Sequence, residues 1–92
     1  MDMELWDFNN FTFGQDIKLA IIVVYDSPTD YNNKFVARLF DIDVPTPYII
    51  VKDSFQEMID AIPNNFIFFD QFKSDDPAIS CVFIQGAEVT LS

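Results

Sequence analysis

Residues 17–25, IKLAIIVVY, constrain the fold more than any other part of the chain. From Leu19 onward, apolar side chains fill both alternating sets of positions, so a strand built from this segment has no polar face. Such a strand belongs in the middle of a sheet, covered on both sides or nearly so. The segment therefore predicts the central strand around which the remaining elements have to be arranged.

The next segments predict two more strands of the same sheet. Residues 26–33, DSPTDYNN, are rich in turn-forming residues, and residues 34–42, KFVARLFDI, alternate between two faces. Together with the central strand they predict an antiparallel hairpin with a long loop. YIIVK at 48–52 predicts a third strand. We expect VPTP at 44–47 to lie outside the ladder, because its two prolines have no N–H to donate.

A short helix is predicted within residues 53–63, DSFQEMIDAIP. Ser54 and Glu57 have the S-x-x-E spacing of a capping box, in which each side chain satisfies a free backbone N–H of the first turn. The apolar residues fall at helical spacing and predict one buried stripe: Phe55, Met58, Ile59 and Ile62. Pro63 ends the helix. A helix this short requires packing against a sheet to be stable.

The C-terminal third predicts a second strand pair. FIFFDQF at 66–72 and AISCVFIQ at 78–85 are apolar and aromatic, and KSDDP at 73–77 predicts the turn between them. Residues 86–92 are expected to form a tail. The resulting order predicts a single α+β domain over residues 1–92, with a mainly antiparallel sheet of about five strands and one short helix packed on one face.

The N-terminal residues 1–16 contain large aromatic side chains among acids and amides: Trp6, Phe8, Phe11 and Phe13. The alternation in residues 11–13 is typical of a short strand, which Gly14 ends. One interpretation is an arm or edge strand that covers the core. The other is an aromatic contact site for a partner, because Trp is enriched at interface hot spots.

The charge of the chain restricts its partners. Fifteen Asp and Glu face five Lys and Arg, so the net charge is −10. Such a field repels nucleic acid and anionic lipid, and it attracts a basic protein. Host nucleic-acid-binding proteins and nucleases are the commonest proteins of that kind. There is no signal-peptide pattern, and the longest apolar run is too short to cross a membrane, so we expect a cytoplasmic location in a bacterial host cell.

The residue types required by most catalytic sites are missing. The chain has no histidine, one cysteine and two glycines, which argues against histidine-based catalysis, a structural zinc site and a glycine-rich phosphate loop. Cys81 lies in an apolar strand and is expected to be a core residue. Asp41-x-Asp43 and Asp75-Asp76 leave hard-cation binding open, although their positions are typical of strand ends and turns. We expect no enzymatic activity, no cofactor and no metal.

The acidic residues are instead candidates for a partner-binding surface. Spaced carboxylates can imitate the phosphates of DNA or RNA and occupy a basic channel of another protein. Trp6 and Tyr31 are candidate aromatic contacts for that partner. The candidate acidic residues come from two loops and the helix: Asp26, Asp30, Asp53, Glu57, Asp60, Asp75 and Asp76.

About half of the chain, residues 23–63 with the later DDPAI, resembles short acidic proteins encoded by phages and prophages of Gram-positive bacteria. The shared features are a DSP turn, a proline-rich crossing, a D-S-x-x-E helix start and a D-D-P turn. The resemblance implies a mobile-element setting and no particular site. The strand–strand–helix order is also similar to that of HicB-type antitoxins, but the Gly-Cys-rich segment that precedes their helix is missing here.

These observations lead to one hypothesis and three alternatives. The chain is expected to be a phage- or mobile-element-encoded inhibitor that binds a basic, nucleic-acid-handling host protein, with an anti-CRISPR protein acting by nucleic-acid mimicry as the most concrete version. The first alternative is an antitoxin or immunity protein that neutralises a cognate toxin. The second is a carboxylate-based enzyme or metal binder. The third is a homo-oligomer, such as a homodimer, formed through the arm between Trp6 and Phe13.

Overall fold

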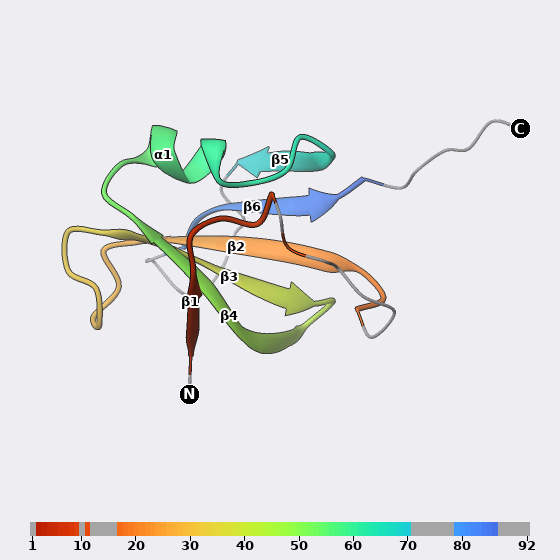
Figure 1. Cartoon of the computed structure of the whole chain (residues 1–92), viewed down its shortest axis with the longest axis horizontal. Helices are drawn as coiled ribbons and strands as arrows, with labels where there is room; N and C mark the ends of the chain where they lie inside the picture. The colour runs from red at the N-terminus through yellow and green to blue at the C-terminus, as the bar shows by residue number, and fades with distance from the viewer. Residues whose placement is uncertain (1, 10, 12–16, 71–78, 87–92) are drawn as a thin grey trace, which may run out of the picture.

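The computed structural model describes residues 2–9, 11, 17–70 and 79–86. Within them the chain forms one open sheet and one short helix (Figure 1). The elements in chain order are β1 Met3–Leu5, β2 Ala20–Asp26, β3 Phe35–Asp41, β4 Val44–Lys52, α1 Phe55–Asp60, β5 Phe66–Asp70 and β6 Ile79–Gln85. The predicted turn at 73–77, most of the predicted tail at 86–92, and Thr12 and Phe13 lie outside the described residues.

The described sheet has six strands in the order β1-β4-β3-β2-β6-β5. All neighbouring pairs are antiparallel except β1 and β4, which are parallel. The predicted α+β class with one short helix is confirmed. The expectation of a mainly antiparallel sheet of about five strands is roughly met, with one difference: the N-terminal strand forms at Met3–Leu5 and joins the edge parallel to β4, so the described sheet has six strands and is mixed. Phe11, in the predicted strand 11–13, belongs to no strand.

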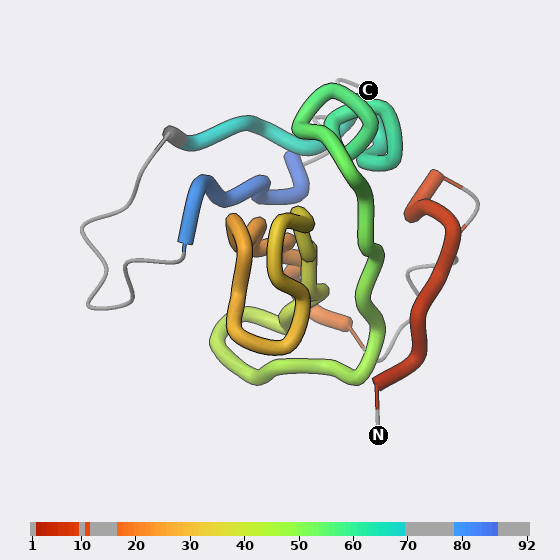
Figure 2. The backbone as a smooth tube through the Cα atoms, turned by 90° about the vertical axis from the view of Figure 1, so that its left-hand side faces the viewer, coloured from red at the N-terminus to blue at the C-terminus, as the bar shows by residue number. Residues whose placement is uncertain are grey.

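The central strand is correctly predicted, since β2 lies between β3 and β6. It begins three residues later than the predicted segment. Its Ala20, Ile22 and Val24 are fully buried, whereas the alternate residues on the opposite face are half-buried. Figure 2 shows the reason: α1 lies over one side of the sheet, between the end of β4 and the start of β5. The core is therefore concentrated between the helix and that face.

The helix covers six residues and begins as predicted. Ser54 is the N-cap and accepts a hydrogen bond from the Glu57 N–H at 3.2 Å. The predicted apolar stripe is only partly buried, because Met58 and Ile62 enter the core and Ile59 remains exposed. Since α1 ends at Asp60, Ile62 reaches the core from the turn that follows the helix.

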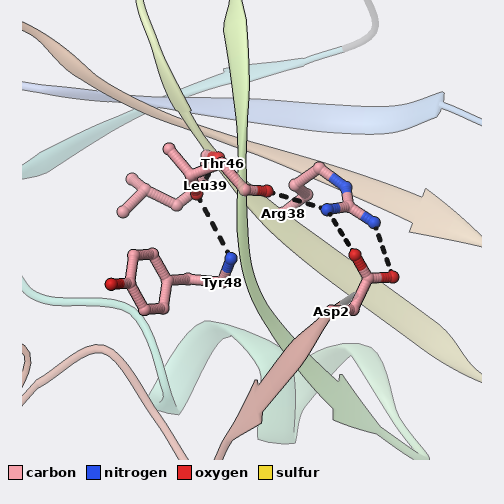
Figure 3. A network of polar contacts seen from close by, with 5 residues as sticks. All are labelled: Asp2, Arg38, Leu39, Thr46 and Tyr48. Atoms are coloured by element: carbon pink, nitrogen blue, oxygen red, sulfur yellow. Dashed lines mark hydrogen bonds and ion pairs between the residues drawn. The ribbon is translucent and has the colours of Figure 1, made fainter.

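The proline segment corrects another expectation, because β4 begins at Val44 and includes both prolines. Strand β1 pairs with β4 only from Tyr48 onward, so the proline segment has β3 as its only neighbour in the sheet. Its pairing with β3 is irregular between Arg38 and Phe40. There the Thr46 hydroxyl donates to the Leu39 carbonyl at 2.6 Å, which replaces part of the missing ladder (Figure 3). Prolines are tolerated at such open, irregular positions.

One arginine joins three segments of the chain. Arg38 in β3 donates from Nη1 and Nη2 to the two carboxylate oxygens of Asp2, both at 2.9 Å (Figure 3). Its Nη1 also donates to the Thr46 carbonyl at 2.8 Å. A two-point guanidinium–carboxylate contact fixes orientation as well as distance. Arg38 therefore ties the residue before β1 across β4 to β3.

This contact predicts a pH-dependent contribution to stability. Hydrogen bonding to Arg38 lowers the pKa of the Asp2 carboxyl below its ordinary value of 3.8. The contribution is complete above pH 3.8, and it is lost as the pH falls through the lowered pKa of the folded state. We expect Asp2→Asn to melt below the unmodified chain at pH 7 and the two to converge below pH 3.8, as measured by thermal unfolding across pH.

The control for this experiment is Asp43→Asn, which removes the same charge from the exposed β3–β4 turn. Its effect on melting should be smaller than that of Asp2→Asn at pH 7. A difference between Asp2→Asn and the unmodified chain that stays constant from pH 7 to pH 3 would contradict the assignment.

Candidate functional site

The segment that follows β1 is fixed to the end of the helix. Phe8 is 0% exposed and belongs to the core cluster with Met58 and Ala61. Its N–H donates to the Ala61 carbonyl at 2.8 Å, and the Asn9 side-chain amide donates to the Asp60 carbonyl at 2.9 Å. The segment thus satisfies carbonyl groups at the C-terminal end of α1, where no further turn of helix is available to do so.

Trp6 lies between two fixed neighbours and is itself exposed. On one side Leu5 pairs with Ile50 of β4, and on the other side Phe8 is buried. The backbone of Trp6 is therefore held in place, although 82% of the residue is accessible to solvent. A large aromatic side chain in this condition is a typical interface residue, because little ordering entropy remains to be lost on binding.

Lys52 lies beneath the tryptophan. It is the last residue of β4 and is only 8% exposed. Its ammonium nitrogen lies 3.6 Å from the centroid of the Trp6 ring, which is a cation–π contact. One face of the indole therefore covers Lys52, while the high exposure of Trp6 leaves the other face open to solvent.

Two hollows adjoin this pair. The first has a volume of about 170 Å³ and is lined by Trp6, Asp7, Lys52, Glu57, Asp60 and Ala61. The second has a volume of about 310 Å³ and is lined by Glu4, Trp6, Lys34, Val51, Lys52, Asp53 and Glu57. They share Trp6, Lys52 and Glu57, so we treat them as one site and call it the Trp6 cleft.

The Trp6 cleft is acidic. Five carboxylates line it against two ammonium groups, those of Lys34 and Lys52. Lys34 forms an ion pair with Asp53, which leaves the first hollow with the stronger excess of negative charge. The carboxylates of the cleft are Glu4, Asp7, Asp53, Glu57 and Asp60.

Local hydrogen bonds hold several of these carboxylates in place. Glu57 accepts a hydrogen bond from the Ser54 hydroxyl at 3.0 Å, as part of the helix cap. Asp60 accepts from the Gln56 side chain at 3.1 Å, one helical turn earlier. Asp7 accepts from the Asn9 N–H at 3.1 Å. The cleft is therefore a preorganised acidic site beside an exposed aromatic ring.

The structure brings four of the predicted partner-binding residues together at the cleft: Trp6, Asp53, Glu57 and Asp60. The β2–β3 loop carries three others, the exposed Asp26 and Asp30 and the half-buried Tyr31. These three do not line the cleft. Asp75 and Asp76 lie outside the described residues. The partner-binding role of all nine residues remains a prediction.

The loop residues nevertheless lie at the same end of the sheet as the cleft. Asp26 pairs with Phe35, and Phe35 pairs with Lys52. Asp26 is thus two strand spacings, about 10 Å, from Lys52 along the sheet. The loop and the cleft form one continuous acidic end of the molecule.

Sequence reasoning missed Glu4, Asp7, Lys34 and Lys52. Lys52 meets Trp6 because β1 runs parallel to β4, with Leu5 opposite Ile50, two residues before Lys52. A parallel pairing between residues 45 positions apart leaves no local pattern in the sequence. The large aromatic residues of the arm were the available sequence signal that part of it packs on the core, but they did not distinguish buried Phe8 from exposed Trp6.

The acidic lining and the exposed indole of the cleft favour non-covalent recognition of a cation. The chain has no histidine. Within the described ranges, no group of three or more carboxylate or cysteine side chains is arranged to hold a metal ion, and no helix there is long and apolar enough to cross a membrane. Asp41 has a structural role, because its carboxylate accepts from the Lys18 N–H at 3.0 Å.

Comparison of the chain with protein-family models, with curated protein sequences and with solved structures finds no match in any of the three.

The arrangement predicts opposite roles for the two aromatic residues of the arm. We expect Phe8→Ala to lower the free energy of unfolding by about 3–5 kcal/mol, because it empties a fully buried site. Trp6→Ala should cost less than about 1 kcal/mol, since the side chain is mostly in water. Urea unfolding followed by circular dichroism measures both.

Phe8→Leu serves as a milder variant if Phe8→Ala does not fold. Equal losses of stability for Trp6→Ala and the Phe8 variants would show that Trp6 is a structural residue, and would remove the main reason to regard it as a contact for a partner.

Proposed function

We propose that this chain is an inhibitor, encoded by a phage or mobile element, that binds a basic, nucleic-acid-handling host protein through the acidic end around the Trp6 cleft. The observation that carries the proposal is Trp6, held rigidly at 82% exposure beside five carboxylates. Interfaces are typically organised in this way, with a central aromatic residue and a polar surround.

The electrostatics support a basic partner. With a net charge of −10, the chain attracts positively charged surfaces over a distance of about one Debye length, roughly 8 Å at physiological salt. Such attraction mainly accelerates association and selects against acidic partners. Proteins that handle nucleic acid have the basic surfaces required, and the resemblance of residues 23–63 to phage-encoded proteins supports a host target.

The most specific form of the proposal is an anti-CRISPR protein that imitates nucleic acid. Carboxylates of the β2–β3 loop and of the helix end would occupy sites that normally hold phosphates. The continuity of Asp26 with the cleft across β3 supports this form. An antitoxin or immunity protein would use the same acidic end against a toxin, and a basic toxin gene beside the gene for this chain would favour that alternative.

The test is a capture experiment from bacterial lysate with the full chain as bait. We expect a nucleic-acid-binding protein to be retained at 50 mM salt and released as salt rises, because screening weakens contacts between exposed charges. Binding of the captured protein is then measured with purified variants. Asp60→Asn should weaken it about 5-fold or more, whereas Asp43→Asn, on the β3–β4 turn, should have little effect.

Three outcomes count against the proposal: recovery of no nucleic-acid-binding protein, a complex indifferent to salt, and equal effects of the two substitutions. Competition by short DNA or RNA for the same partner tests the mimicry specifically.

A second candidate function, self-association, is favoured by one observation at the other edge of the sheet. Among the described strands, β5 pairs only with β6, and its Ile67, Phe68 and Phe69 are 54%, 48% and 41% exposed. Hydrophobic edge strands without lysine or proline are prone to pair with another strand. Two copies could pair antiparallel about Phe68, with Ile67 opposite Phe69 of the second copy.

Sedimentation distinguishes this candidate from binding of a basic partner, because the two respond to salt in opposite ways. Two copies each carrying a charge of −10 repel one another, so a dimer should strengthen as salt rises. Phe68→Lys should abolish it, whereas Trp6→Ala should not. A monomer at all salt concentrations removes this candidate.

A further inference from the structure

We propose that the Trp6 cleft binds one arginine side chain on an extended segment of the partner, and that Lys52 donates a hydrogen bond to a main-chain carbonyl of the same segment. This inference rests on the proposed function, since it assumes a protein partner. It adds the chemical identity of the bound group and assigns a role to Lys52.

The starting point is the environment of Lys52. The residue is more than nine-tenths buried and lines both hollows of the cleft. An ammonium group has three N–H donors. Within the part of the chain that the structure describes, its Nζ makes a cation–π contact with Trp6 and no hydrogen bond or ion pair. Since no buried side-chain nitrogen or oxygen of the described residues lacks a partner, the Lys52 Nζ itself keeps contact with water in the cleft and is open to an acceptor supplied from outside the chain.

The tryptophan supplies a surface for a flat cation. Lys52 occupies one face of the indole, and the exposure of Trp6 leaves the opposite face open. A guanidinium group is planar and weakly hydrated, so it stacks on an aromatic ring with less desolvation cost than an ammonium group. Arginine therefore fits the open face better than lysine.

The carboxylates supply the countercharge. Three of them, Asp7, Glu57 and Asp60, line the first hollow, where Lys52 is the one cationic side chain in the lining. Among the residues that the structure describes, the hydrogen bonds to the carboxylates of Asp7 and Asp60 use only Oδ1, which leaves Oδ2 of each for a ligand. A guanidinium group can donate to two such oxygens at once. The cleft thus combines a stacking face, carboxylate oxygens and a side-chain donor for a main-chain carbonyl.

An arginine in a peptide satisfies all three features, whereas other cations satisfy fewer. A free metal ion does not require a flat aromatic face, and it cannot accept a hydrogen bond from Lys52. A nucleic acid offers acceptors to Lys52 but places phosphates against the carboxylates, which repel them. A lysine side chain offers charge without a planar face. The combined chemistry therefore selects arginine within an extended peptide.

The experiment uses Trp6 as its own reporter, because it is the only tryptophan of the chain. The full-length protein is titrated with the capped tripeptide Gly-Arg-Gly, and tryptophan fluorescence is followed. Matched peptides contain citrulline, which has nearly the same shape without the charge, or lysine. We expect saturable binding of the arginine peptide, binding at least 5-fold weaker for lysine, and no saturation for citrulline.

Variants assign the individual contacts. Asp60→Asn should weaken the arginine peptide about 5-fold or more, with Asp43→Asn as the matched control that leaves it unchanged. Lys52→Met should weaken the peptide but not methylguanidinium, which has no carbonyl for Lys52 to contact. Trp6→Phe retains a smaller aromatic face, and its binding is measured by calorimetry. Circular dichroism confirms that each variant is folded.

The proposal is overturned if citrulline and arginine peptides bind equally, if Asp60→Asn has no effect, or if Lys52→Met weakens methylguanidinium and the peptide alike. If the peptide fails to bind while the lysate experiment still recovers a salt-sensitive basic partner, the arginine assignment is wrong and the proposed function stands. Failure of both experiments rejects both.

Discussion

Burial of Phe8 is the constraint on which the candidate site depends. The side chain fills a position between the helix and the sheet, and its N–H satisfies the Ala61 carbonyl. A fully buried aromatic ring contributes several kcal/mol, far more than any single surface contact in this small domain. Because Phe8 is in the core and β1 is in the sheet, the backbone between them holds Trp6 over Lys52 at the end of β4. The cleft is therefore a consequence of core packing.

The charge of the chain has two functions in this structure. Some carboxylates complete local structure: Asp41 accepts from backbone N–H groups, and Asp2 pairs with Arg38. Other carboxylates line the cleft, and the described hydrogen bonds to Asp7 and Asp60 there use only one oxygen of each. Since both kinds contribute equally to a net charge of −10, the total alone says little about binding. Their positions relative to Trp6 distinguish them.

Local patterns in the sequence predicted the local elements of the fold. The central strand, the hairpin with β3, and the capped helix each have a signature within about ten neighbouring residues. The parallel pairing of β1 with β4 has none, because it joins residues 45 positions apart. The contact of Arg38 with Asp2 is long-range in the same sense, since 36 positions separate the two residues. Ile42 in the β3–β4 turn has a φ of 58°, a value that β-branched residues rarely adopt, so turn propensities do not predict this conformation.

The same distinction applies to the candidate site. Trp6, Glu57 and Asp60 could be selected from the sequence by type, because aromatic and acidic residues are the expected contacts of a basic partner. Lys52 could not be selected, since a lysine at the end of an apolar strand is ordinarily a solvated residue that marks the end of burial.

Lys52 connects the stability of the fold with the proposed binding site. Enclosing an ammonium group costs free energy unless charge or aromatic density compensates it. Here the compensation comes from the Trp6 ring and from carboxylates of the cleft, which are the same groups that a partner would contact. A bound segment that supplies a carbonyl to Lys52 and a cation to the carboxylates would satisfy the ammonium group and the carboxylates at the same time. In the proposed complex, these paired contacts would add binding energy that buried area alone does not provide.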